Sequence, residues 1–532
     1  MSYTAVFAAV IAALALFWST RRRGTINIIA GPPSPSWIFG DFDFVLSRKS
    51  ALPIIVLGNM LQLLISPQYG EYEFKWNKVY GSVYRIKGCL GQDRLIVSDP
   101  IPMQYVMNSP NFPHSPLLLA LCHWIFGAQS AIVRNGDDQR QLRASLNPAF
   151  TAAAVRQYQP VFLKVAQTIT EQLDQSDAPS IDLCPLLSAA TLKSICEVVF
   201  GCPTEDLGAD YVNNNNKIVH ISSTQSTGQV LGGAICALLP QWLLHRVMYL
   251  PTKTFRACRA QLYFANREGR RLVREKTEAA KRGLETDGDL YGVLLNSNRP
   301  GAKSIREDDI VGQTSIITIA GQDSTANTLA FGLIELAKNP QFQDSLRAEI
   351  HAAFGTSGYR EKIPYDNMPL LNAFIKESLR MYPAEALSDR TASEDVVIPL
   401  SDGITTTAGE RINQIHVRKG EVVTLAIASY QRMESRWGAD ADKFRPTRWL
   451  DGTVYQGEAV SPYANLLSFL GGPHICLGLS ARHDVRPPAG NLLVLRELKR
   501  AVRMLNRYFI DEDLHVGSLR LGFGFLDTSM VP

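Results

Sequence analysis

A cysteine close to the carboxyl end of the chain stands where its sulfur can do chemistry. Residues 469–478 read FLGGPHICLG, so Cys476 follows a pair of glycines and a proline. Glycines let the backbone approach a flat ligand closely, and backbone N–H groups near a sulfur favour the thiolate, the form that binds metals. The run therefore predicts a reactive or metal-binding cysteine, with a buried structural cysteine as the alternative.

An acid and two hydroxyls interrupt a long apolar stretch. Asp323, Ser324 and Thr325 lie inside residues 310–336, whose apolar periodicity predicts a helix. Such residues weaken the backbone ladder of a helix, so their presence in its interior indicates a purpose. A positioned acid beside hydroxyl groups can relay protons. The alternative is a kinked helix without a chemical role.

Charged residues elsewhere can support such a site. Glu377 and Arg380 stand three apart in a predicted amphipathic helix, a spacing that is common on solvated faces and carries little weight alone. Arg143, Arg390 and Arg448 lie in other segments. Arginine binds carboxylates through parallel N–H groups, which suits it to hold the acidic groups of a cofactor. For Arg143, a solvated helix face is the alternative.

The loop around Cys476 resembles the haem-binding signature of the cytochrome P450 family. Phe469, Gly472 and Cys476 match positions of that signature, and His474 stands where an arginine is usual. The resemblance implies that Cys476 is the axial thiolate ligand of haem b and donates electron density that favours O–O cleavage. It also places Phe469, Gly472 and His474 beside the haem.

Charged motifs of the same family occur in the expected order. Glu377 and Arg380 match its Glu-x-x-Arg, and Arg448 ends its later Pro-x-Arg element. The resemblance implies that these three residues form a structural ion-pair network that holds the cysteine loop. It further implies that Arg143 and Arg390 bind the haem propionates.

The interrupted helix carries another motif of the family. Residues 320–325 read AGQDST, which matches a small pair, any residue, an acid and usually threonine. Ser324 takes the threonine position and Thr325 follows it. The resemblance implies that Asp323, Ser324 and Thr325 are catalytic and line the distal wall.

The resemblance implies a haem-thiolate monooxygenase of fungal type. Such an enzyme inserts one atom of dioxygen into a lipophilic small molecule, here a terpenoid, a steroid or an aromatic xenobiotic. NADPH supplies its electrons through NADPH–cytochrome P450 reductase. Two alternatives stay open: a reductase-independent haem-thiolate isomerase or dehydratase, and a degenerate haem protein without turnover.

Helical periodicity dominates the body of the chain. Predicted helices cover residues 152–173, 255–281, 310–336 and 339–354, and predicted strands cover 83–86, 94–97, 396–399, 416–417 and 421–425. Residues 213–216 and 281–289 are predicted to be exposed loops. We expect a mainly α protein with a small β region, the cytochrome P450 fold, preceded by one N-terminal transmembrane helix.

The amino end is different in kind. Residues 5–18 form an uninterrupted apolar run, and three arginines follow at 21–23. Positive charge after the apolar stretch favours an anchor over a removed signal peptide and places the body in the cytosol. We expect a single-pass anchor in the endoplasmic reticulum membrane at 4–20, a basic, proline-rich hinge at 21–45 and a catalytic domain at 46–532.

Composition fits a globular enzyme. The 532 residues are 46% hydrophobic and 20% charged, which excludes a disordered, collagen-like or disulfide-framework protein. The net charge of +4 is too small for nucleic acid to be the main partner. The 8 cysteines include no Cys-x-x-Cys pair, which argues against a structural zinc site.

Two segments depart from the family pattern. Residues 48–67 resemble an insertion, and the apolar part at 51–65 predicts a helix lying on or partly in the membrane surface. Residues 482–490 include Pro487 and Pro488, which cannot continue the helix that the family places after the cysteine. Either that helix restarts further on or the segment is an error of gene modelling.

Overall fold

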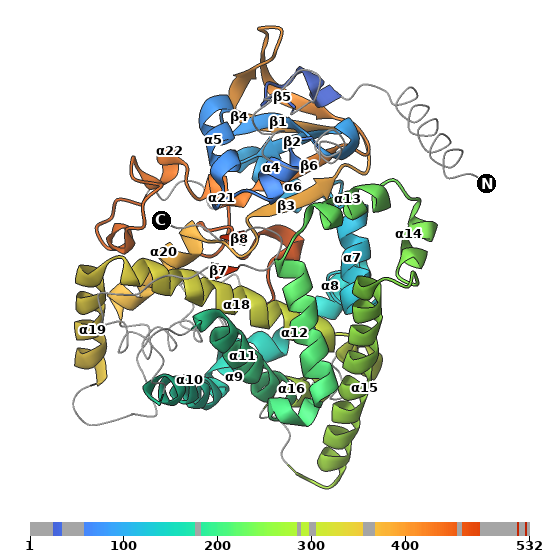
Figure 1. The fold of residues 1–532 in the computed structure, drawn as a ribbon, viewed down its shortest axis with the longest axis vertical. Helices are drawn as coiled ribbons and strands as arrows, with labels where there is room; N and C mark the ends of the chain where they lie inside the picture. The colour runs from blue at the N-terminus through green and yellow to red at the C-terminus, as the bar shows by residue number, and fades with distance from the viewer. Residues whose placement is uncertain are drawn as a thin grey trace.

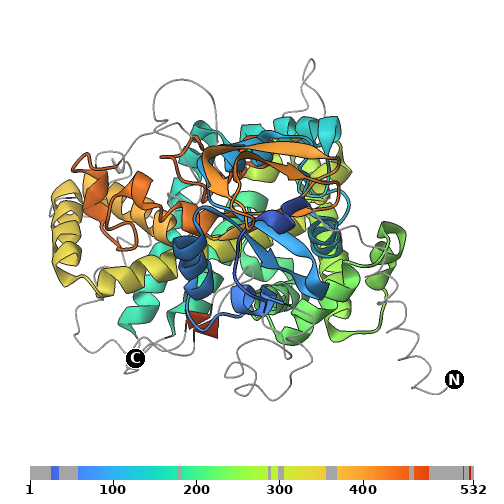
Figure 2. The same ribbon diagram turned by 90° about the horizontal axis from the view of Figure 1, so that it is seen from above.

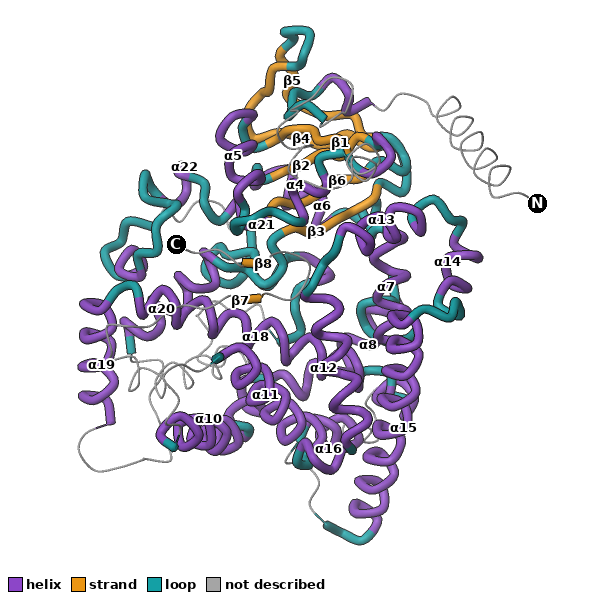
Figure 3. The backbone as a smooth tube through the Cα atoms, in the orientation of Figure 1, coloured by secondary structure: helices purple, strands orange, loops and turns teal. Residues whose placement is uncertain are grey.

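The structure of the protein is a computed structural model that describes residues 25–34, 58–175, 182–284, 289–296, 305–354, 368–454, 460–478, 519–520 and 527–528. Most strands gather at one end of the molecule, at the top of Figure 1, and helices fill most of the remainder, as the colouring in Figure 3 shows. The expectation of a mainly α protein with a small β region is confirmed. The predicted anchor at 4–20 and the segment 482–490 lie outside the described residues.

A four-stranded sheet forms the larger part of the β region. Its strands, in spatial order, are β1 (Val83–Lys87), β2 (Asp93–Val97), β6 (Val422–Ala426) and β3 (Leu387–Thr391). β2 and β6 are parallel, and the other pairs are antiparallel. The smaller sheets pair β4 (Val396–Thr405) with β5 (Arg411–Val417) and β7 (Leu519–Arg520) with β8 (Asp527–Thr528). All the runs predicted as strands are therefore confirmed.

The helices of the amino-terminal half precede the long helix α15. They are α4 (Met60–Leu64), α5 (Glu71–Tyr80), α6 (Pro100–Asn108), α7 (Pro116–Phe126), α8 (Gly136–Leu146), α9 (Ala152–Gln157), α10 (Gln159–Asp174), α11 (Leu183–Ile195), α12 (Ala209–Ser223), α13 (Thr227–Cys236) and α14 (Gln241–Val247).

The remaining helices include those that carry the acid and the Glu-x-x-Arg motif. They are α15 (Lys253–Lys281), α16 (Leu290–Asn296), α17 (Glu307–Val311), α18 (Thr314–Ala337), α19 (Pro340–Phe354), α20 (Pro369–Met381), α21 (Ile427–Tyr430) and α22 (Glu434–Trp437). α14 and α19 lie at opposite sides of the molecule, as Figure 1 and Figure 2 agree.

Helix α18 runs through the helical part and is buried over most of its length. It packs against α11, α12, α15 and α20, and the residues buried there include the polar Ser315, Thr318 and Gln322. The single helix predicted over 310–336 is in fact two helices, because Gly312 separates α17 from α18. A Cβ at Gly312 would lie 2.4 Å from that of Gln129, so the close approach requires glycine.

Two predicted loops are corrected by the structure. Residues 213–216 belong to α12, although asparagine has a low helix propensity, because their amides make tertiary hydrogen bonds. In the second predicted loop, residues 282–284 are exposed as expected. Asp289 is instead buried and paired with Lys276 at 2.5 Å, so the prediction of exposure is wrong there.

The segment predicted to lie at the membrane surface is part of the core where the structure describes it. Met60 and Leu61 on α4 are 5% and 2% exposed. Met60 packs with Trp76 and Tyr84, and Leu61 packs with Val230 of α13. The expectation of an immersed helix is therefore wrong for α4, whose apolar residues fill the space between the sheet and α13.

One described stretch, Leu183–Phe200, is long and apolar enough to cross a membrane by length and composition, with a mean hydropathy of 1.6. Half of it is buried inside the protein, and α11 packs between α10 and α18. Its hydropathy is that of a core helix.

Residues 25–34, within the predicted hinge, contact the larger sheet, where Arg85 donates its backbone N–H to the carbonyl of Ala30 at 2.9 Å.

Candidate functional site

The loop that carries Cys476 is tightly closed. The backbone N–H of Cys476 donates to the carbonyl of Phe469 at 2.9 Å, and Gly472 to His474 form one 3₁₀ turn inside this closure. Gly472 has a φ of 66°, and a Cβ there would lie 2.6 Å from the carbonyl oxygen of Met107 on α6. Glycine at 472 is therefore required both by its conformation and by the close packing of the loop on α6.

Cys476 differs from the other cysteines in its surroundings. Its residue is exposed, whereas the other seven are buried or half-buried. Burial raises the thiol pKa of six of them, which are Cys89, Cys122, Cys196, Cys202, Cys236 and Cys258. Burial lowers the pKa of the Arg143 guanidinium, and the thiolate charge of Cys476 opposes that shift. Among the cysteines, Cys476 thus has the access and the neighbouring cation that a thiolate ligand needs.

Arg143 bonds the cysteine loop directly, and Arg390 is connected to the loop through His114. Arg143 on α8 donates to the backbone carbonyl just before the cysteine, and Gln139, one turn earlier, donates to Nδ1 of His474 at 3.0 Å. The His474 ring packs edge to face on His114 with centroids 4.6 Å apart. His114 in turn accepts at Nδ1 from Arg390 of β3 at 2.8 Å. The structure therefore joins α8, the cysteine loop and β3 in one cluster.

Both imidazoles of this cluster are neutral. Burial lowers the pKa of His114 to about 2, and the charge of Arg390 and the neighbouring His474 lower it further. Burial lowers the pKa of His474 to about 4, with Arg390 and Arg143 acting in the same direction. Because guanidinium has donors only, His114 carries its proton on Nε2. Neutral rings can therefore lie close together beside two cations.

Arg143 and Arg390 contrast with Arg380 and Arg448, which share the carboxylate of Glu377. Within the part of the chain that the structure describes, neither Arg143 nor Arg390 forms a salt bridge, and their hydrogen-bond partners are neutral groups. Two cations without a paired carboxylate, beside an exposed thiol, fit a haem with two propionates and one axial ligand.

The predicted ion-pair residues meet in the core. The side chains of Glu377, Arg380 and Arg448 are 0% exposed. Arg380 donates to both oxygens of Glu377 at 2.9 and 2.8 Å, and Arg448 donates to one of them at 2.9 Å. Burial by itself raises the pKa of Glu377, but the hydrogen bonds and charges of Arg380 and Arg448 outweigh it and hold that pKa below its ordinary value.

Gln431 connects this network to the cysteine loop. It donates to the carbonyls of Leu379 and Arg380 at 3.0 and 2.8 Å, and its own oxygen accepts the backbone N–H of Leu467 at 2.7 Å. Ser468 adds a bond to the Leu379 carbonyl at 2.7 Å. The α20 motif therefore contacts the start of the loop through hydrogen bonds. Gln431 was missed at the sequence level because it lies in no recognisable motif.

The acid and the two hydroxyls of α18 differ in burial, since Asp323 and Thr325 are buried and Ser324 is half-buried. Asp323 is 5% exposed, and burial raises its pKa to about 7, partly offset by a hydrogen bond with Asn327. Oδ2 of Asp323 has no hydrogen-bond partner among the described residues. Half-buried Ser324 donates to the carbonyl of Ala320 at 2.7 Å.

The side chain of Thr325 points in a different direction from that of Ser324. It is 0% exposed, and its hydroxyl has no partner among the residues that the structure describes. Consecutive residues of an α-helix point about 100° apart. The hydroxyl of Thr325 therefore points about 100° away from that of Ser324 around the helix, into a buried region.

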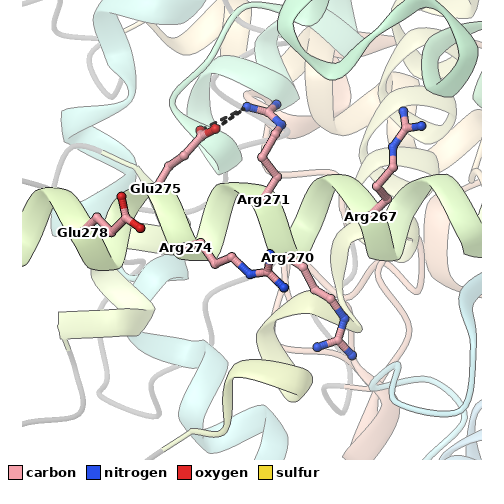
Figure 4. Close-up of a pocket in the computed structure, with 6 residues that line it drawn as sticks. All are labelled: Arg267, Arg270, Arg271, Arg274, Glu275 and Glu278. Carbon is pink, nitrogen blue, oxygen red and sulfur yellow. Dashed lines mark hydrogen bonds and ion pairs between the residues drawn. The ribbon is translucent and has the colours of Figure 1, made fainter.

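A pocket lies on α15, and its lining includes none of the site residues described above. Figure 4 shows its lining, which consists of Arg267, Arg270, Arg271, Arg274, Glu275 and Glu278. Arg271 pairs with Glu275 at 2.9 Å, the contact drawn as a dashed line, and Arg270 pairs with Asp308 at 2.8 Å. These ion pairs lie at the surface, and they neutralise part of the positive charge of the arginines that line the pocket.

Taken together, the fold and the cysteine site are those of a haem-thiolate protein. The model of the cytochrome P450 family matches residues 49–481, and the chain belongs to this family. The match ends just before the predicted interruption at 482–490. Members of the family bind haem through a cysteine thiolate, and the chain is an oxidoreductase of the monooxygenase type.

Curated relatives come from fungi. The chain is 28% identical over 483 residues to cytochrome P450 monooxygenase 81 of Postia placenta, covering 87% of this chain and 84% of the relative. It is 28% identical to cytochrome P450 monooxygenase 91 of the same fungus, covering 87% of each. It is 26% identical to cytochrome P450 monooxygenase claO of Ampulloclitocybe clavipes, covering 86% and 83%. The expectation of a fungal-type member is confirmed.

Proposed function

We propose that the protein inserts one atom of dioxygen into a lipophilic small molecule, a terpenoid, a steroid or an aromatic compound, using electrons that NADPH–cytochrome P450 reductase supplies from NADPH. The balanced reaction is RH + O₂ + NADPH + H⁺ → ROH + H₂O + NADP⁺. The observation that carries this proposal is Asp323, a buried acid next to Ser324 on α18, one of whose oxygens has no hydrogen-bond partner in the described part of the chain. An isomerase or dehydratase that acts on a peroxide takes up no net protons, so it does not need a relay that carries protons from water to dioxygen.

Several residues of the cluster would hold the haem. Cys476 would provide the axial thiolate, and Arg143, Arg390 and His474 would bind the propionates. Phe469 would pack beside the ring, and glycine at 472 keeps the loop close enough to accept it. When bound, the haem supplies an iron centre that activates dioxygen.

Asp323 is suited to move protons at neutral pH. Burial holds its pKa at about 7, so its carboxyl gains and loses a proton in the working range of an enzyme. Ser324 now donates to the Ala320 carbonyl, and rotation of its side chain would free the hydroxyl to pass a proton onward. We assign Asp323 and Ser324 to the relay and place Thr325 outside it.

The amino end supports a membrane location for this reaction. An apolar run at 5–18 followed by arginines at 21–23 fits a single-pass anchor at 4–20 and a hinge at 21–45, with the catalytic domain at 46–532 on the cytosolic face of the endoplasmic reticulum. An anchored domain meets substrates that partition into lipid. The reductase, also bound to membranes, would meet the domain on the same face.

A spectrum followed by a turnover assay tests the proposal. The reduced protein should give the thiolate-type carbon monoxide difference band, and NADPH should be consumed with product formed only when reductase is present. A normal band together with turnover of a peroxide substrate without reductase would favour the isomerase. Absence of the band would indicate a degenerate haem protein.

A further inference from the structure

A buried amide stands directly before the acid of α18. Gln322 is 0% exposed, and its side-chain oxygen accepts from Nδ2 of Asn215 at 2.7 Å. Its side-chain nitrogen donates to Oγ of Ser188 at 2.9 Å and to Oδ1 of Asn216 at 3.0 Å. Both N–H donors and the oxygen of Gln322 are thus engaged, by residues of α11 and α12.

The bonding continues to α15. Gln261 is also 0% exposed, and it donates to Oδ1 of Asn215 at 3.1 Å and to Oγ of Ser315 at 3.3 Å. Asn214 donates to Oε1 of Gln261 at 3.0 Å. We name the amide side chains that bond Gln322 or its partner Asn215 the amide cluster; its members are Asn215, Asn216, Gln261 and Gln322, and Asn214 bonds Gln261 from outside this set. Leaving one of its buried polar groups unpaired is costly, so the cluster specifies one arrangement of the helices it joins.

The backbone of α18 is held at the same place. The hydroxyl of Thr191 on α11 lies 3.0 Å from the carbonyl oxygen of Gln322. A Cβ on Gly321 would lie 2.6 Å from Cδ1 of Ile195, so the Ile195 side chain of α11 packs directly against the backbone of α18. Neither sliding nor rotation of α18 at this position is possible without breaking these contacts.

We propose that the amide cluster is a positioning device for proton delivery, which fixes Asp323 and Ser324 by fixing the residue before them; this rests on the proposed function. Oδ2 of Asp323 has no hydrogen-bond partner among the described residues, so the backbone does much to orient the carboxyl. Gln322 shares a peptide bond with that acid. Loosening the cluster therefore changes the proportion of electrons that form peroxide more than it changes haem binding.

The fate of electrons can be measured without knowing the substrate. An enzyme supplied with NADPH and no substrate either releases peroxide, O₂ + NADPH + H⁺ → H₂O₂ + NADP⁺, or forms water, O₂ + 2NADPH + 2H⁺ → 2H₂O + 2NADP⁺. Poor proton delivery favours the first reaction. The ratio of peroxide to water, with reductase present, therefore reports on the position of the relay.

Asn215→Asp is the informative variant. It replaces the donor facing Gln322 with an oxygen, so two acceptors oppose each other. Asn214→Asp is the matched control, because it makes the same charge change on the neighbouring residue, whose amide bonds Ala257 and Gln261 and not Gln322. Asn216→Ala is a milder variant, since it removes one bond to Gln322 from an exposed position.

We expect Asn215→Asp to raise the peroxide-to-water ratio by about threefold or more, with a normal thiolate-type band. Asn216→Ala should act in the same direction, and Asn214→Asp should leave the ratio unchanged. An unchanged ratio in both Asn215→Asp and Asn216→Ala overturns the proposal. An equal rise in the Asn214→Asp control also overturns it, because the effect would then come from general loosening.

Hydrogen–deuterium exchange separates this proposal from the proposed function. Amides of α18 around Gln322 should exchange faster in Asn215→Asp than in the Asn214→Asp control, with the holoenzyme and without NADPH. Equal exchange in the two variants overturns the positioning role. If the native protein lacks the thiolate-type band or consumes no NADPH, the proposed function fails, and the exchange comparison still decides whether the cluster positions α18.

Discussion

Replacing Glu377 with glutamine should destabilise the fold strongly. The carboxylate accepts from Arg380 twice, from Arg448, from the backbone N–H of Arg445 at 2.8 Å and from the Trp449 indole at 2.9 Å. An amide keeps one oxygen and turns N–H donors toward other donors, so two arginines remain buried beside a neutral group. Removing one partner of a buried ion pair costs about 3–5 kcal/mol, a large part of a typical 5–15 kcal/mol of unfolding free energy.

Denaturant unfolding and haem content check this prediction. The matched control is Glu275→Gln on α15, which breaks an Arg271 pair of similar length with side chains 37% and 56% exposed. That surface pair should contribute no more than about 1 kcal/mol. A Glu377→Gln midpoint that shifts no more than the Glu275→Gln midpoint, with normal haem content, would refute the reasoning.

The pH dependence of this difference has a definite sign. The pKa of Glu377 is lowered in the folded state from the ordinary 4.5, so its stabilising effect is complete above pH 4.5. The effect is lost as pH falls through the lower folded pKa. The gap in stability between the native protein and Glu377→Gln should therefore narrow only below pH 4.5.

Three further changes test the site. Cys476→Ala should abolish the thiolate-type band, whereas Cys202→Ala, at a half-buried cysteine, should keep it; a band surviving in Cys476→Ala would point to a different ligand. Ser324→Ala should raise peroxide released per NADPH by about threefold, and Thr325→Val should not, because its buried hydroxyl has no partner among the described residues; equal effects would contradict the separation of the two hydroxyls. Asp323→Asn should gain stability relative to the native protein as pH rises from 3.8 to about 7, because burial penalises the charged carboxylate; denaturation midpoints across this window check it, and a constant difference would count against titration there.

The charged core could be predicted in part from the sequence. Glu377, Arg380 and Arg448 meet as expected because each belongs to a motif with fixed spacing. Their link to the cysteine loop through Gln431 could not be predicted, since a lone glutamine far along the chain carries no periodic signal. Trp449 follows Arg448 directly, but nothing in the sequence indicates that its indole donates to Glu377.

Tertiary hydrogen bonds decided what sequence patterns could not. Residues 213–216 have low intrinsic helix propensity, and the bonds of Asn214, Asn215 and Asn216 to other helices favour the helical conformation. His114 belongs to no recognisable motif. It joins the cluster of α8, the cysteine loop and β3 because residues 114 and 390 pair as a β-bridge. Contact between residues so distant in sequence could not be predicted without the fold.

The parallel pairing of β2 with β6 joins two strands that the ribosome synthesises at widely separated times. Arg94 and Thr424, which bond across this pair at 3.4 Å, lie 330 residues apart. At a ribosomal rate of about 5–20 residues per second, the hairpin of β1 and β2 waits roughly 15 to 65 seconds for its neighbour. Throughout that interval one edge of β2 offers unpaired backbone groups to any other nascent strand. Expression at slow translation therefore lengthens the period of exposure, and a chaperone that covers the hairpin should raise the yield of folded protein.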